Sequence, residues 1–179
     1  MTDPNEMRKI SLETYAVLRN IEKFKEFMFA DFDKTIELAR SEKGAPNLML
    51  ALVLTAYTEF WGRFMLGVTI NKNKECFDAF FCQLGRNYKD LLDKHGNIYD
   101  RFRSGLVHEY LIKGSSKVVI EGGECGIDSD EKTGSFNFYV RRYLEDFKFA
   151  VNLYIHELTR NLDNFNKARE VLEKKAQLL

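Results

Sequence analysis

The sequence predicts an all-α fold, a helical bundle of about five helices with a small β-hairpin inserted near residues 116–139. Apolar residues recur at helical spacing along most of the chain, and both prolines stand where a helix can begin. Only one short stretch changes to the period of β-strands. With 179 residues and 45% hydrophobic content, the chain can build one core, so we expect a single domain over residues 1–179.

The first two helices follow the two prolines. Helical spacing continues from Pro4 to Gly44, a residue suited to a C-terminal cap, and the helix is either continuous or kinked near Ala30. The second helix, from Pro46 to about Gly67, is apolar nearly all round. Such a helix should be the central one, contacted from several sides.

The rest of the chain continues the helical pattern on either side of the insertion. Helical periodicity resumes at Cys76 and continues to Lys94, after which Asn97 is a suitable N-cap for the next helix. His95 is expected to act as a cation at the C-terminus of the preceding helix. Two or three short strands are expected in residues 117–139, and one long helix from about Arg141 to the end.

The composition indicates the cellular compartment and limits the kinds of binding partner that we expect. Lys plus Arg (27) equals Asp plus Glu (27), so no bulk positive field attracts nucleic acid. This balance argues against a duplex-coating protein but leaves room for local recognition. Three cysteines without metal-ligand spacing suit a reducing cytoplasm. The polar N-terminus predicts no signal peptide, and the most apolar run, residues 48–57, is too short to cross a bilayer. We expect a cytoplasmic protein with no membrane segment, metal or cofactor.

One stretch, residues 99–111, carries the candidate chemistry, because it holds Arg103 and His108. On an α-helix, residues five apart lie about 140° apart, so these two side chains do not share a face. One apolar stripe faces the core, and a second apolar side, with Val107, lies between the two polar residues. A second apolar side indicates burial on both sides or pairing with another chain. A two-fold axis over Val107 would bring the Arg103 and His108 flanks of two chains into one cleft.

Arg103-x4-His108 resembles the R-x4-6-H signature of the HEPN superfamily, which comprises all-helical domains that include metal-independent, dimeric ribonucleases. The longer pattern through Tyr110 is similar to that of HEPN toxins paired with nucleotidyltransferase antitoxins. The resemblance covers residues 45–113 well and the ends only by helical character. It implies a HEPN-like bundle, a homodimer, RNA as substrate or ligand and, for the toxin form, a nucleotidyltransferase antitoxin.

The resemblance also implies roles for the residues. One His108 takes the proton of a ribose 2′-hydroxyl, its dimer mate protonates the leaving 5′-oxygen, and Arg103 stabilises the phosphate charge. Ser104 departs from the family, in which Asn, Asp or His often follows the arginine. The resemblance therefore implies that Glu109 or Tyr110 supplies the polar side chain that assists Arg103 and His108. Tyr110 is otherwise a packed core aromatic, whereas the toxin resemblance implies that a partner nucleotidylates it.

Three further residues are candidates for supporting roles. Glu59 and Arg63 are an i,i+4 pair, which predicts a salt bridge at an exposed helix edge. The alternative is that Glu59 orients Arg103 or His108 from a neighbouring helix. Arg101 and Lys113 flank the motif and are candidates for contacts with RNA phosphates.

Two functions stay open from the sequence. The first is a homodimeric, metal-independent endoribonuclease that leaves a 2′,3′-cyclic phosphate and serves as a toxin or defence component. The second is a non-catalytic HEPN-like module that binds a nucleotide, an RNA or a partner protein.

Overall fold

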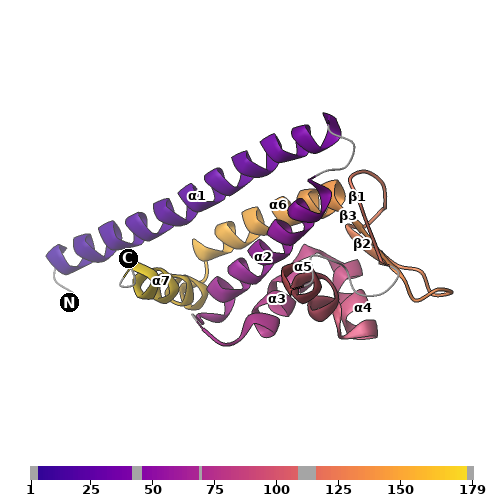
Figure 1. Ribbon diagram of the computed structural model, residues 1–179. Helices are drawn as coiled ribbons and strands as arrows, with labels where there is room; N and C mark the ends of the chain where they lie inside the picture. The colour runs from indigo at the N-terminus through magenta and orange to yellow at the C-terminus, as the bar shows by residue number, and fades with distance from the viewer. Residues whose placement is uncertain (1–3, 42–45, 69, 109–115, 177–179) are drawn as a thin grey trace.

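A computed structural model describes residues 4–41, 46–68, 70–108 and 116–176, which are mostly helical with one small three-stranded sheet. Figure 1 shows α1 (Pro4–Ser41) lying across α2 (Asn47–Leu66) and α6 (Val140–Leu158). The sheet lies at one end of this arrangement, and α7 (Leu162–Ala176) lies near the other.

The first helix, α1, is continuous over 38 residues, and no kink interrupts it near Ala30. Its buried residues include Ile21, Met28, Phe32 and Ala39, which follow helical spacing and form one stripe against the body of the protein. Gly44, the expected end of this helix, lies outside the described residues.

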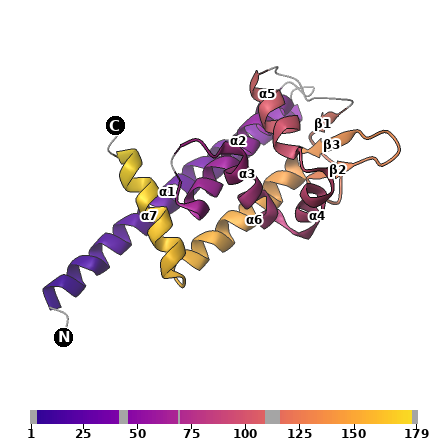
Figure 2. The same ribbon diagram turned by 90° about the horizontal axis from the view of Figure 1, so that it is seen from below.

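The second helix, α2, is the central one, as its apolar sequence predicts. It contacts α1, α3 (Asn73–Phe81), α6 and α7 (Figures 1 and 2). Leu54 and Trp61 are fully buried on it. The helix ends at Gly67, which adopts a left-handed conformation (φ 68°) that a glycine reaches without steric cost.

Two of the predicted long helices are broken, so the structure describes more than the expected five or so. The segment expected as one helix over residues 76–94 is divided into α3, the 3-10 turn η1 (Cys82–Leu84) and α4 (Arg86–His95). Gly85 makes this break with φ 142°, a conformation that L-residues rarely adopt. The C-terminal helix is also divided, because α6 ends at Leu158 and the Asn161 side chain caps α7 by accepting backbone N–H bonds from residues 163 and 164. Apolar spacing continues through both breaks, which is why the pattern alone predicts uninterrupted helices.

The insertion forms a three-stranded sheet in the order β1-β3-β2, so the fold is mostly helical with one small β insertion, as predicted. The predicted hairpin is confirmed by β2 (Ile127–Ser129) and β3 (Phe136–Tyr139), which pair antiparallel. A third strand, β1 (Lys117–Val119), pairs parallel with β3 on its other edge. Residues alternate between the two faces of β3, so Phe136 and Phe138 both face the core. Both rings contact Phe102 there.

Two expectations about composition can be compared with the described residues. The three cysteines are free, and Cys76 and Cys125 are buried. No helix in the described ranges is both long and apolar enough to cross a membrane.

The contact between α2 and α3 depends on Gly62. A Cβ atom at this position would lie 1.7 Å from the carbonyl oxygen of Cys76, an impossible distance to a backbone atom. We expect Gly62→Ala to lower the free energy of unfolding by about 3 kcal/mol or more, because the two helices must separate. Urea unfolding followed by circular dichroism measures this loss.

A matched control is Gly134→Ala, at a left-handed glycine with no atom near its added Cβ. We expect this control to lose only about 1 kcal/mol, from backbone strain alone. Equal losses for the two variants would contradict the close approach of α2 and α3.

Candidate functional site

Arg103 lies in η2 (Tyr99–Ser104), a π-helical turn that continues into the short α-helix α5 (Gly105–His108). The Gly105 backbone N–H bonds the carbonyl of Asp100, five residues earlier, which is the π-helical pattern. The separation of about 140° between Arg103 and His108 assumes an unbroken α-helix, so it does not apply across this turn. Single π turns inside helices occur frequently at functional sites.

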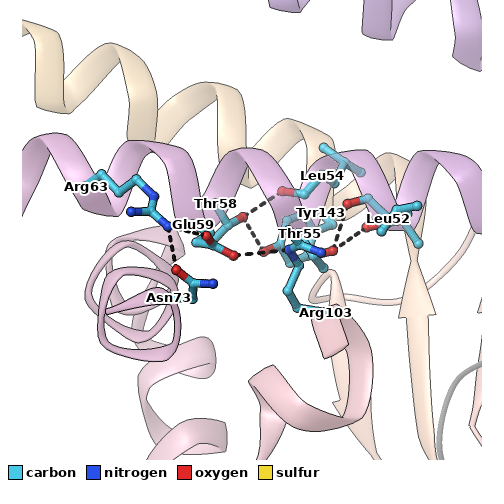
Figure 3. A network of polar contacts seen from close by, with 10 residues as sticks. Leu52, Leu54, Thr55, Thr58, Glu59, Arg63, Asn73, Arg103 and Tyr143 are labelled. Carbon is cyan, nitrogen blue, oxygen red and sulfur yellow. Dashed lines mark hydrogen bonds and ion pairs between the residues drawn. The ribbon is translucent and has the colours of Figure 1, made fainter. Parts of the chain in front are cut away.

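The centre of the site is the carboxylate of Glu59, which projects from α2 between two arginines (Figure 3). Oε1 accepts a hydrogen bond of 2.8 Å from Nη2 of Arg63. Oε2 lies 3.2 Å from Nε of Arg103, close enough for an ion pair although the two groups are not aligned for a hydrogen bond. The predicted salt bridge between Glu59 and Arg63 is confirmed. Glu59 is only 6% exposed, however, so the expected position of this pair at an exposed helix edge is wrong. The alternative contact between Glu59 and Arg103, from neighbouring helices, is present.

This charge arrangement leaves part of Arg103 available for a ligand. A buried carboxylate needs compensation, and here two guanidinium groups lie beside the one carboxylate of Glu59. Arg103 uses its Nε for the pair, and its terminal nitrogens bond no other residue in the described part of the chain. Its side chain is 20% exposed. The planar fork of a guanidinium held in this way is suited to an anionic oxygen pair such as that of a phosphate.

Sequence reasoning missed two partners of this cluster. Asn73, at the start of α3, accepts a hydrogen bond of 2.5 Å from Nη2 of Arg63. Tyr99 lies close enough that burial, followed by the negative charge of Glu59, raises the pKa of its hydroxyl. The pattern predicts Asn73 as a loop residue and Tyr99 as part of an apolar stripe, and neither position carries a signal for this contact.

A buried hydroxyl pair fixes the adjacent turn of α2. Thr58 Oγ1 lies 2.9 Å from the Leu54 carbonyl oxygen and 2.7 Å from the Tyr143 hydroxyl of α6 (Figure 3). Burial raises the pKa of Tyr143 far above its ordinary value, so this hydroxyl stays neutral. The residue next to Glu59 is therefore anchored to α6.

Several predicted site residues cannot be placed in this cluster. His108 ends α5, but its side chain and that of Val107 are not described. Glu109, Tyr110 and Lys113 lie outside the described residues, so their roles stay predictions. Ser104 is half-buried and closes the π turn.

Arg101 contacts the sheet of its own chain. Its guanidinium carbon lies 4.4 Å from the centre of the Phe136 ring, and Nη1 lies 3.5 Å from the Ser116 hydroxyl. The first distance is that of a cation–π contact. These contacts connect the sheet to η2. A contact of Arg101 with RNA stays a prediction.

His95 lies against the same Phe136 ring, with centroids 4.9 Å apart and its Nε2 3.2 Å from the Ser129 hydroxyl. It is in the last turn of α4, as predicted. Burial, followed by the positive charges of Lys94 and Arg101, lowers the pKa of the ring below 6.5. The expected helix-terminal cation is therefore a neutral ring at neutral pH.

The described residues contain no group of three His, Cys, Asp or Glu side chains placed to hold a metal ion. Comparisons of the chain with models of protein families, with curated proteins and with solved structures found no match.

Glu59 should be essential to the stability of this cluster. We expect Glu59→Gln to lower the free energy of unfolding by about 3 kcal/mol, because two largely buried guanidinium groups lose their counter-charge. Glu145→Gln is the control, since Glu145 pairs with Arg141 at the surface and should contribute less than about 1 kcal/mol. Urea unfolding compares the two variants, and a loss no larger than the control's would contradict the buried pairing.

The lowered pKa of His95 predicts that the stability of the protein depends on pH. Its folded-state pKa is lowered, so the unfolded chain binds more protons between that pKa and 6.5, and stability rises with pH across this window. We expect His95→Gln to flatten the rise in urea midpoint as the pH increases toward 6.5. The exposed His156 provides the control, because His156→Gln should keep the slope. An unchanged slope in His95→Gln would contradict the lowered pKa of this ring.

Proposed function

We propose that the chain is a metal-independent endoribonuclease of HEPN type that acts as a homodimer. One observation carries the proposal. Arg103 is held through Nε by the buried carboxylate of Glu59, while its terminal nitrogens remain available on the helix that ends at His108. A fixed, partly exposed guanidinium five residues before a histidine supplies the two groups that phosphodiester cleavage by this route requires.

The proposed reaction needs only groups of the protein and the RNA. A neutral His108 from one chain takes the proton of a ribose 2′-hydroxyl, whose oxygen attacks the adjacent phosphorus. The protonated His108 of the second chain gives its proton to the leaving 5′-oxygen. Arg103 stabilises the charge of the five-coordinate phosphate, and the product is a 2′,3′-cyclic phosphate.

Glu59 acts in this scheme as a positioning residue. It makes no contact with RNA, and it holds the Arg103 side chain in one orientation through the pair at Nε. A guanidinium fixed before the substrate arrives loses less conformational entropy when it binds phosphate.

A direct test incubates the purified protein with single-stranded RNA in EDTA and analyses the ends of the products. We expect cleavage with 2′,3′-cyclic phosphate ends, and at least about 100-fold slower cleavage by His108→Ala and Arg103→Ala. The controls His156→Ala and Arg160→Ala change exposed residues of the same types outside the motif and should cleave at the normal rate.

The outcomes separate this proposal from its alternatives. RNA binding that is lost in Arg103→Ala, without any cleavage, would favour a non-catalytic HEPN-like binding module. A mass increment on Tyr110 after co-expression with a nucleotidyltransferase would identify the toxin form. A monomer in sedimentation, or no effect of His108→Ala on cleavage, would contradict the composite dimeric site.

A further inference from the structure

An apolar groove of about 660 Å³ runs between α1, α2 and α7, on a different side of α2 from the Glu59 cluster. Phe60 and Phe64 of α2 lie along it, together with Phe24 and Phe27 of α1. The Phe60 ring lies 6.3 Å from the Phe24 ring and 5.0 Å from the Phe64 ring, so these aromatics form a continuous surface. Leu172 of α7 lines the groove as well.

The size and lining of the groove fit a small ligand. Ligand sites in proteins typically enclose about 300–1,000 Å³, are mostly apolar and contain a few polar groups that fix orientation. Phe27 is 72% exposed, although a ring of this size would normally be covered. The groove thus presents apolar surface that nothing in the described chain covers.

The charges at the groove select the sign of the ligand. Glu173 forms an ion pair with Arg169, whose Nε lies 3.6 Å from its carboxylate. Lys23 forms no ion pair with any residue in the described ranges. Asn20 precedes Lys23 by three positions on α1, so the two side chains are neighbours on one helix face. An ammonium and an amide next to each other match the two oxygens of a carboxylate.

We propose that this groove binds a single-chain amphiphile with a carboxylate head, such as a medium- or long-chain fatty acid. The carboxylate pairs with Lys23 and Asn20, and the alkyl chain covers the exposed faces of Phe24 and Phe27 down to Phe60 and Phe64. The driving force is removal of apolar surface from water, while Lys23 supplies the preference for an anionic head. This binding is independent of the proposed ribonuclease activity.

Trp61 provides a built-in reporter for the test. It is the only tryptophan of the chain, and its ring lies 5.9 Å from the Phe60 ring and 5.7 Å from the Phe64 ring. Laurate is titrated below its micelle concentration while Trp61 emission is recorded. We expect a saturable change with laurate, and at least about tenfold weaker binding of hexanoate, which lacks chain length, and of dodecyltrimethylammonium, which carries the opposite charge.

Three variants test the assignment of the groove. Lys23→Gln and Phe27→Ala change exposed side chains and should each weaken laurate binding about tenfold. Phe149→Ala is the control, because Phe149 is 64% exposed on α6 and does not line the groove, and it should bind laurate normally.

Three results would overturn the proposal. The first is an emission unchanged by laurate, and the second is a cationic amphiphile that binds as tightly as laurate. The third is a self-association of the protein that Phe27→Ala abolishes and laurate leaves unaffected, which would show that a second copy covers the groove instead.

Discussion

The placement of one negative charge inside the protein organises the region that carries the candidate chemistry. Glu59 lies on the central helix α2, and its two oxygens face arginines from its own helix and from η2. Burying a carboxylate is costly unless a positive charge compensates it, so the buried state of Glu59 depends on the contact between α2 and η2. Contacts between apolar side chains are not directional and allow two helices to shift slightly. The ion pair between Glu59 and Arg103 instead fixes which turn of η2 faces which turn of α2.

The π turn and the buried charge support each other. A π turn is a less favourable backbone conformation than an α-helix, so it forms where surrounding contacts stabilise it. Here Phe102 is fully buried below the turn, and Arg103 is held by Glu59 beside it. The local backbone therefore depends on tertiary contacts, and the same contacts decide where the guanidinium points. The aromatic groove on the other side of α2 uses the neighbouring positions 60 and 64, so one helix supports two chemically different surfaces.

The coarse fold can be predicted from the sequence because the residues that face the core are apolar and recur at the spacing of a helix or a strand. The central α2 and the hairpin of β2 and β3 both follow from this spacing. The breaks at Gly85 and Asn161 do not, because apolar spacing continues across them and the decisive events are a backbone angle and a side-chain cap. In the site, the i,i+4 spacing reveals the Glu59–Arg63 pair, but only tertiary packing shows that it is buried and shared with Arg103. Asn73 joins the cluster across a turn, and no local pattern indicates such a contact.

The position of Phe136 has a consequence for how this chain can be engineered. Its ring contacts His95, Arg101 and Phe102, so the strands form part of the wall of the core and are not a separable insertion. Trimming them would open the interior beside the motif helix to solvent. The turn between β2 and β3 is different, because an added Cβ at Gly134 meets nothing within 4 Å. An epitope tag or a fluorescent label inserted there would extend into water and leave the interior intact.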